Sequence, residues 1–267
     1  MTPDLRGRRI VNTRAVQQAG AFDALIRARG AVPLAYPCIA IVPPADTAPL
    51  DAALLGLATG AFDWLVLTSA NTVYSLAQRL DALDLTLDDS RRFRTAAVGE
   101  ATAQAAQDWL KLPVDLMPDD YVAEALAAAL LAAVDAGVGR RVLLPESAIA
   151  RPTLAQLLTD GGAAVTVVDA YRTVRGAGGV DLAGLLRQGA VDVVTFTSSS
   201  TVTYCVERLA AEGGDITGLA AVCLACIGPK TAQTAADHGL TVTVIPDTYT
   251  LEGMLDALAQ YWTMKSG

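Results

Sequence analysis

The chain repeats part of its own sequence at a nearly constant spacing, and this feature constrains its fold more than any other. Four segments recur at offsets of 128 to 132 residues: 63–73 at 192–202, 98–103 at 227–232, 118–124 at 246–252, and 7–11 at 139–143. The agreement among the offsets predicts two copies of one unit of about 130 residues.

Each copy alternates short apolar runs of strand length with helical patterns. The expected strands are 9–12, 32–35, 64–67, 96–98 and 114–117 in the first copy, and 142–144, 165–168, 191–196, 222–227 and 241–245 in the second. The expected helices of the first copy are 21–29, 73–83, 101–110 and 122–136, with Gly30 and Gly137 among the helix stops. About five parallel strands per copy, with helices on both faces, is a doubly wound α/β plan.

Two extended segments are candidates for crossings between domains. Residues 36–44 are apolar and bracketed by prolines, and residues 169–174 occupy the corresponding place in the second copy. Both leave a strand by an extended path rather than a tight turn. The residues leave open whether each copy folds on itself or the copies exchange their first strand-helix-strand unit.

Composition excludes several classes of function. The 267 residues carry 20 Lys and Arg against 28 Asp and Glu, and a net charge of −8 argues against nucleic acid as a partner. The apolar run 125–134 is too short to cross a bilayer, and the N-terminus has no apolar targeting segment, so we expect a cytoplasmic protein without membrane contact. Four cysteines in apolar surroundings are expected to be reduced and structural: Cys38, Cys205, Cys223 and Cys226.

Polar motifs fall where ligands collect in parallel sheets, beyond the carboxyl ends of strands. Residues 68–72, 99–102, 197–201 and 228–231 each follow an apolar strand and open a helix. Hydroxyl groups there serve as helix caps, and free amides with the helix dipole form an anion site. Caps without a ligand are the commoner use of a single such motif. Because none is a nucleotide-binding fingerprint, we expect no dinucleotide or nucleoside triphosphate cofactor.

Individual side chains narrow the chemistry further. His238, the sole histidine, is expected at a helix end in a structural role, so the chain builds neither a catalytic triad nor a multi-histidine metal site. Cys223 and Cys226 point to opposite faces of one strand, which disfavours a redox or zinc role. Tyr171 either donates a proton to a ligand or packs as an interface tyrosine, and Arg14 is either an anion contact or a solvated charge.

Six motifs, in this order and spacing, resemble the uroporphyrinogen-III synthase family over essentially the whole chain: residues 11–14, 67–73, 97–103, 170–173, 196–200 and 227–232. The resemblance implies two flavodoxin-like doubly wound domains joined by a two-segment linker. One domain is then discontinuous, 1–36 plus 174–267, and the other is 37–173, with linker segments 37–44 and 169–173.

The resemblance also implies an activity. Members of the family are lyases that cyclise the linear tetrapyrrole hydroxymethylbilane to uroporphyrinogen III, losing water and inverting the terminal pyrrole ring through a spiro intermediate. The reaction serves haem, sirohaem and cobalamin biosynthesis and uses neither cofactor nor metal. We expect a monomer that makes transient contact with the preceding pathway enzyme. A polycarboxylate substrate suits a receptor of helix N-termini and hydroxyls.

The resemblance assigns candidate residues by position. Tyr171 matches a tyrosine proposed to assist departure of the hydroxyl as water. The substrate-binding candidates are Arg14, Ser69, Ala70, Asn71, Thr102, Ser198, Ser199, Lys230 and Thr231. Residues 197–200 depart from the turn that is frequent in the family, which leaves the separate roles of Ser198 and Ser199 open.

Two alternatives compete with this function. One is a non-enzymatic cytosolic two-domain sensor that binds a polyanionic small molecule. The other is a different lyase or transferase acting on a polyanionic metabolite. Turnover of hydroxymethylbilane to the type III isomer discriminates the three.

Overall fold

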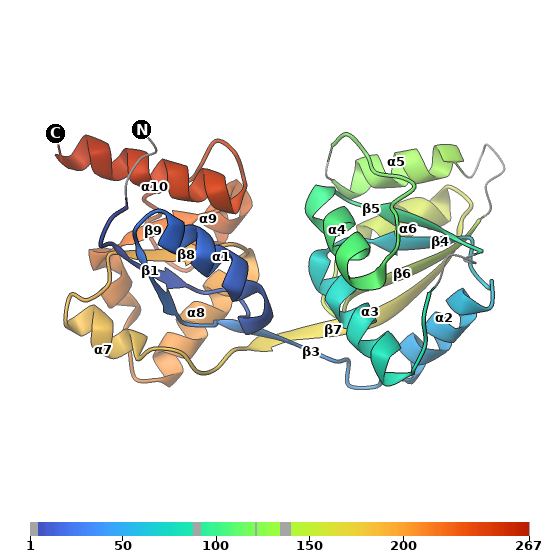
Figure 1. Cartoon of the computed structure of the whole chain (residues 1–267), viewed down its shortest axis with the longest axis horizontal. Coiled ribbons are helices and arrows are strands. Elements are labelled where there is room, and N and C mark those ends of the chain that lie inside the picture. Colours follow the sequence, from blue (N-terminus) through green and yellow to red (C-terminus); the bar gives the residue numbers. More distant parts are fainter. Residues whose placement is uncertain (1–4, 88–91, 121, 134–139, 267) are drawn as a thin grey trace. The chain divides into compact units, whose positions relative to one another are not determined.

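The computed structural model describes residues 5–87, 92–120, 122–133 and 140–266. The chain forms two compact units: unit 1 consists of Met1–Ala40 with Thr173–Gly267, and unit 2 is Ile41–Arg172. In Figure 1, unit 1 accordingly combines blue segments with orange and red ones. The boundaries expected from the sequence, after residues 36 and 173, lie within four residues of these.

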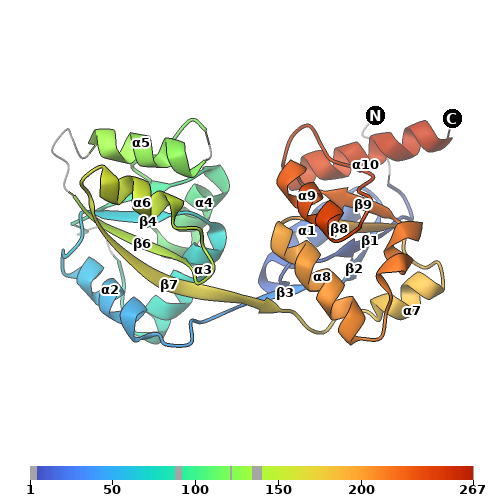
Figure 2. The same cartoon turned by 180° about the vertical axis from the view of Figure 1, so that it is seen from behind.

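Unit 1 is built on a four-stranded sheet of order β2-β1-β8-β9, in which the neighbouring strands run parallel. Its strands are β1 (Arg9–Asn12), β2 (Val32–Ala35), β8 (Val193–Phe196) and β9 (Cys223–Cys226). Two helices pack on one face, α1 (Val16–Ala28) and α10 (Leu251–Ser266). The other face carries α7 (Leu182–Arg187), α8 (Ser199–Ala211), a 3₁₀ turn (Ile216–Ala221) and α9 (Pro229–Asp237), the last three in front of the strands in Figure 2.

Unit 2 holds a five-stranded sheet of order β3-β7-β6-β4-β5. Its strands are β3 (Ile39–Val42), β4 (Trp64–Leu67), β5 (Arg94–Ala97), β6 (Arg141–Ser147) and β7 (Ala164–Arg175). One face packs on α2 (Ala48–Ala58), α3 (Ala70–Ala82), α4 (Glu100–Ala105) and a π-helical turn (Ala106–Leu110). The other face packs on α5 (Ala123–Ala133) and α6 (Thr153–Asp160). The predicted α/β class with parallel sheets and helices on both faces is confirmed.

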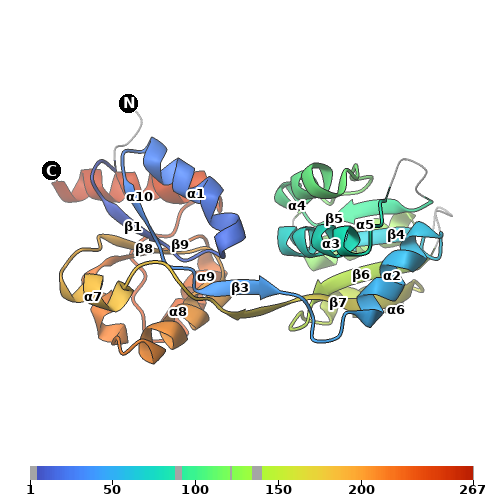
Figure 3. The ribbon, with the colours of Figure 1, turned by 60° about the horizontal axis from the view of Figure 1, so that its bottom comes forward.

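The chain passes from unit 1 to unit 2 within β3 and returns within β7. These two hydrogen-bonded strands therefore run in opposite directions, as their arrows show in Figure 3. The segment 36–44, expected to be extended, contains β3, and the segment 169–174 is part of the twelve-residue β7. The sheet of unit 2 is thus not wholly parallel, which the expected plan did not include.

Two expected strands are wrong in the same way. Residues 114–117 and 241–245 each contribute a single bridge, Ala96 to Leu116 and Ala225 to Val244. In each unit, two successive amides donate to one carbonyl: those of Asp115 and Leu116 to Thr95, and those of Thr243 and Val244 to Leu224. In a regular parallel pair of strands, two amides do not share one carbonyl. The shared carbonyl therefore marks the point where the regular hydrogen-bond pattern stops, after a single bridge. The expected helix 101–110 is also divided, into α4 and the π turn. Residues 134–136 of the expected helix 122–136, and its expected stop Gly137, lie outside the described residues.

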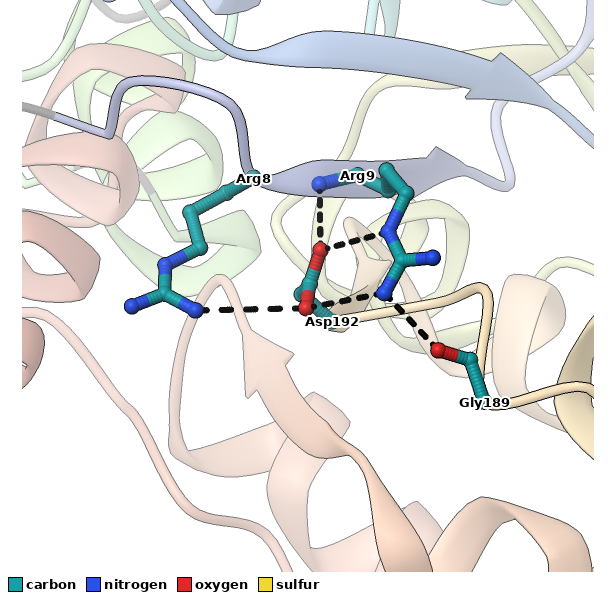
Figure 4. Close-up of polar contacts among 4 residues, drawn as sticks. All are labelled: Arg8, Arg9, Gly189 and Asp192. Carbon is teal, nitrogen blue, oxygen red and sulfur yellow. Dashed lines mark hydrogen bonds and ion pairs between the residues drawn. The ribbon is translucent and has the colours of Figure 1, made fainter.

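Arginine–aspartate clamps of the same design close the amino ends of both sheets. In unit 1, Asp192 accepts hydrogen bonds from Arg9, from its backbone N at 2.7 Å and from its Nε at 2.9 Å, while Arg9 Nη2 donates to the Gly189 carbonyl (Figure 4). In unit 2, Asp63 accepts from Arg141 N at 2.9 Å and from Nη2 at 2.5 Å, and Arg141 Nη1 donates to the Gly60 carbonyl.

The clamps show how the repeated copies are combined. Arg9 belongs to the first copy and its partner Asp192 to the second, whereas Arg141 belongs to the second and Asp63 to the first. The strand ladder agrees, because β1 of the first copy pairs with β8 of the second. The copies have therefore exchanged their first strands.

The expected positions of His238 and of the buried cysteines are confirmed. His238 follows directly after α9, and its Nε2 lies 3.3 Å from Thr203 Oγ1. The four cysteines are free and buried, with Cys223 and Cys226 both in β9, where burial raises their pKa values to about 11 and about 12. Within the described ranges, no helix is both long enough and apolar enough to span a bilayer.

Candidate active site

The polar loops of both units follow the carboxyl ends of parallel strands and open helices. In unit 2, Ser69 follows β4 and is the N-cap of α3, and Gly99 follows β5 and is the N-cap of α4. In unit 1, Ser198 follows β8 and caps α8, and Gly228 follows β9 and caps α9. The sequence motifs thus lie at the edge of each sheet where ligands of such folds bind.

Ser69 and Tyr171 meet in unit 2. Ser69 Oγ accepts a hydrogen bond from Thr72 N at 3.1 Å, lies 3.0 Å from Thr72 Oγ1, and lies 3.4 Å from Tyr171 Oη. The tyrosine side chain is 7% exposed, so its ring is buried against the apolar cluster under α2 and α3. A phenol is thereby held beside a serine hydroxyl at the start of a helix.

A β-bulge determines the face on which Tyr171 lies. Glu146 of β6 pairs with Asp169 of β7, but the next pair is Ser147 with Tyr171, which leaves Ala170 as an extra residue. Since side chains alternate along a strand, one extra residue moves Tyr171 to the opposite face from the one that regular pairing would give. The bulge therefore places the phenol on the α3 side, near Ser69.

The remaining candidates of unit 2 lie at the starts of α3 and α4. Ala70 and Asn71 are the first two residues of α3 and are partly exposed. Thr102 is buried in the first turn of α4, where its amide donates to the Gly99 carbonyl at 3.0 Å. These positions fit contacts between a ligand and the backbone of helix N-termini.

In unit 1, the serine loop is closed by its own capping interactions. Ser198 Oγ accepts from Thr201 N at 3.2 Å, and Thr201 Oγ1 accepts from Ser198 N at 3.2 Å, which completes a capping box. Ser199 Oγ accepts from Thr234 Oγ1 at 2.8 Å and so links α8 to α9. Ser198 is thus engaged in capping, and Ser199 in contact between helices.

The other unit 1 candidates differ in exposure. Arg14 is partly exposed; its Nε donates to the Gln18 carbonyl and its Nη2 to Gln18 Oε1, both at 3.3 Å. Lys230 is exposed in the first turn of α9, and the neighbouring Thr231 is buried. The structure therefore brings Ser69 and Tyr171 into contact, whereas Arg14 bonds to Gln18 in the helix that follows it.

Two further residues of these loops were missed from the sequence. Glu146, the last residue but one of β6, is 7% exposed, and burial raises its pKa to about 7. It corresponds to Arg14 at the same offset that relates Arg9 to Arg141, so the repeat could have indicated it. Tyr249 is 60% exposed, and a Cβ added at Gly228 would lie 3.5 Å from its ring. It belongs to the repeated motif 246–252.

Chemically, these loops offer hydroxyls, the backbone amides of helix N-termini and the phenol of Tyr171. Helix N-terminal amides and hydroxyls bind carboxylates without a full positive charge, and a phenol can donate a proton to a departing oxygen. In the part of the chain that the structure describes, no three His, Cys, Asp or Glu side chains gather as they would around a metal ion.

Two interleaved copies of an α/β unit, each with hydroxyl-bearing loops at the carboxyl ends of its strands, define a class of two-domain α/β proteins in which ligands bind beyond the strand ends. Within that class the family is shown by comparison with known proteins. The family model described as uroporphyrinogen-III synthase HemD matches residues 20–256, and the chain belongs to this family.

Similar proteins and solved structures are also uroporphyrinogen-III synthases. The uroporphyrinogen-III synthase of Synechococcus elongatus is 36% identical over 263 residues, which cover 96% of each chain. A crystal structure of a mutant uroporphyrinogen III synthase from Thermus thermophilus matches 97% of this chain and all of its own, with 21% identity and a TM-score of 0.60. The Helicobacter pylori enzyme matches with 16% identity and a TM-score of 0.56. At such identities the two structures support the fold.

Proposed function

We propose that the chain cyclises hydroxymethylbilane to uroporphyrinogen III, with loss of water and inversion of the terminal pyrrole ring. The observation that carries the proposal is the 36% identity to a uroporphyrinogen-III synthase over nearly the full length of both chains. The site chemistry is compatible, because the polar loops offer neutral donors and a phenol. No observation favours a sensor or a different transferase.

Catalysis begins with departure of the substrate hydroxyl. The Tyr171 phenol donates a proton to that oxygen as the carbon–oxygen bond breaks, and water leaves. Ser69 positions the phenol through the contact between Oγ and Oη at 3.4 Å. The α-carbon of the terminal pyrrole loses a proton when the macrocycle closes, so the overall reaction releases one water and needs no other reactant.

Substrate binding depends on helix N-termini rather than on many cations. The helices α3, α8 and α9 begin beside Ser69, Ser198 and Gly228, and the first-turn amides of a helix point away from its body. Within each unit such groups bind acetate or propionate arms, and restricting a flexible tetrapyrrole favours the conformation that leads to ring inversion. A net charge of −8 over the whole chain is compatible with such local binding.

The proposal includes the setting of the reaction. As a lyase of tetrapyrrole biosynthesis, the protein works as a cytoplasmic monomer and receives hydroxymethylbilane by transient contact with the preceding enzyme. It uses no cofactor or metal of its own.

The test is product analysis. Hydroxymethylbilane is supplied with the purified protein, the products are oxidised to porphyrins, and the isomers are separated by chromatography. We expect the type III isomer to dominate, at a rate proportional to protein concentration. If only the type I isomer forms, at the rate of a protein-free control, the proposal is wrong.

A further inference from the structure

Unit 1 contains a cavity at the end of its sheet opposite to the candidate site. It measures about 340 Å³ and lies at the amino ends of β1, β8 and β9, under the last turns of α10. The residues that give it chemical character are Arg8, Asp192, Cys223, Tyr261, Trp262 and Lys265. A cavity of this size accommodates a small molecule.

Two cationic side chains of the cavity, Arg8 and Lys265, each make a cation–π contact with an aromatic ring. The Arg8 guanidinium lies 4.8 Å from the centroid of the Trp262 ring, and Lys265 Nζ lies 5.7 Å from that of Tyr261. The two rings pack edge to face with centroids 5.1 Å apart. Cation–π contacts of this kind restrict the long side chains without neutralising their charge.

The charge of Lys265 also acts on Cys223, which lines the cavity. Burial raises the pKa of Cys223, and a hydrogen bond with Thr243 and then the nearby charge of Lys265 partly oppose that rise. Lys265 is exposed near the end of α10, yet its charge reaches a thiol that is 7% exposed in β9. Both cations therefore contribute positive potential to the same cavity.

The carboxylate of the cavity is already neutralised. Asp192 accepts three hydrogen bonds from Arg9, from its N, Nε and Nη2 atoms (Figure 4). The Arg8 guanidinium is farther away, with Nη1 3.9 Å from Asp192 Oδ1. One carboxylate, Asp192, thus faces three cations, Arg8, Arg9 and Lys265, so positive charge remains in excess in the cavity.

The second copy shows that the fold does not need these groups. Unit 2 has the same clamp between Arg141 and Asp63, with Arg140 in the place of Arg8. At the offset that relates the motifs 118–124 and 246–252, the positions of Tyr261, Trp262 and Lys265 correspond in sequence to Ala133, Val134 and Gly137. The side chains of Tyr261, Trp262 and Lys265 are therefore specific to unit 1, whereas the arginine–aspartate clamp is common to both units.

We propose that this cavity binds a small oxyanion with two or more negative charges, a phosphate or a dicarboxylate, between Arg8 and Lys265. The two cations provide charge-assisted hydrogen bonds, and the aromatic rings that they contact reduce the side-chain entropy that binding would cost. This site is separate from the loops proposed to bind the tetrapyrrole, so it stands or falls independently of the proposed function.

The test is a titration of the full-length protein with inorganic phosphate and, separately, with malonate. Binding is followed by calorimetry and by Trp262 fluorescence at constant ionic strength, with chloride as the reference anion. We expect saturable binding of one or both oxyanions. Arg8→Gln and Lys265→Gln should each weaken it at least ~10-fold, a loss of roughly 1.4 kcal/mol. Arg140→Gln, the matched control in unit 2, should leave it unchanged.

The proposal is overturned if neither oxyanion gives saturable binding, if chloride competes equally at the same ionic strength, or if Arg140→Gln weakens binding as much as Lys265→Gln. Thermal unfolding provides a second readout, because a ligand that binds only the folded state raises the Tm. The rise should occur in the wild type and be lost in Lys265→Gln, whose altered side chain lies at an exposed position and leaves the core intact.

Discussion

Tyr36 in unit 1 and Tyr171 in unit 2 each follow an alanine, but they lie 135 residues apart, outside the offsets that relate the repeated motifs, and their surroundings differ. Tyr36 is fully buried; its hydroxyl donates to Glu212 Oε2 at 2.9 Å, and the Arg208 guanidinium lies 3.8 Å from its ring centroid. Tyr171 is 7% exposed, and its hydroxyl lies 3.4 Å from Ser69 Oγ.

The difference shows how two tyrosines in similar local sequences can take different roles. In unit 1, Arg208 also donates to the carbonyls of Pro37 and Gly178, so Tyr36 belongs to a network that holds the segment following β2. Burial, followed by the bond to Glu212, raises the pKa of Tyr36 far above its usual value. The phenol of Tyr36 is committed to structure, whereas that of Tyr171 is the one that we propose to act on substrate.

Removing the hydroxyl of each tyrosine in turn tests whether the two residues have different roles. Tyr171→Phe should lower kcat for formation of uroporphyrinogen III about 100-fold, because a proton donor contributes roughly 10²–10⁴ in rate. Its Tm should stay close to that of the wild type, since the ring remains packed. Chromatography of the porphyrin isomers and thermal unfolding by circular dichroism measure the two quantities.

Tyr36→Phe is the matched control. It should retain kcat per folded molecule but lose about 1–2 kcal/mol of stability, because Glu212 loses a hydrogen-bond donor. If Tyr36→Phe lowers turnover as much as Tyr171→Phe while both proteins stay folded, the division of roles between the two tyrosines is wrong.

Arg14 and Glu146 form a second pair of counterparts, with opposite charges. For a carboxyl whose pKa is raised to about 7, the folded state binds the proton more tightly than the unfolded state does. Its contribution is therefore most favourable below about pH 4.5 and is lost as the pH rises to about 7. Glu146→Gln should be more stable than the wild type at pH 8, by at most ~3 kcal/mol, with no difference near pH 4.

Urea unfolding of both proteins at the two pH values measures this difference. Arg14→Gln, at the counterpart position, should show no such dependence on pH, because the guanidinium stays charged throughout. Equal stability of Glu146→Gln and the wild type at pH 8 would mean that the carboxyl carries no such penalty.

The two clamps form the third and most closely matched pair. Hydrogen bonds from Arg141 hold the pKa of Asp63 below its usual range. Burial tends to raise the pKa of Asp192, but the bonds from Arg9 outweigh it and hold that pKa low as well. The stabilisation from both is present above about pH 4 and is lost as the pH falls through the lowered values.

Asp63→Asn and Asp192→Asn should each lower the Tm by a few degrees at pH 7. The effect of Asp192→Asn should be the larger, because Arg8 also lies near that carboxylate. Near pH 2 the variants and the wild type should approach one another. A Tm that falls in only one of the two variants would show that the clamps, despite equal geometry, are not equivalent. Thermal scans at both pH values decide this.

Much of the fold could be predicted from local patterns. Strands 9–12, 32–35 and 64–67 have the expected bounds because four-residue apolar runs next to turn signals have few alternatives. The expected strands 114–117 and 241–245 failed because their pairing depends on which carbonyl each amide reaches. Which carbonyl an amide reaches depends on how the segment lies against the neighbouring strand, and the apolar sequence of the segment does not determine it.

The candidate site could be predicted only in part. The loops at 68–72 and 197–201 were found because hydroxyls after apolar strands signal helix caps. The approach of Tyr171 to Ser69 could not be predicted, since it depends on the single extra residue Ala170 in β7. The burial of Glu146 likewise depends on its place near the end of β6, which lies between the strands β7 and β4 of the sheet.

The crossed clamps have a consequence for how the chain can assemble. Each half contributes one arginine and one aspartate whose partners lie in the other half, so neither half can close the amino end of a sheet alone. Two separately synthesised halves would have to fold by joining, as the subunits of a domain-swapped dimer do. In this sense the single chain is a dimer of its own repeats, in which the peptide link between the copies keeps the partners at high effective concentration.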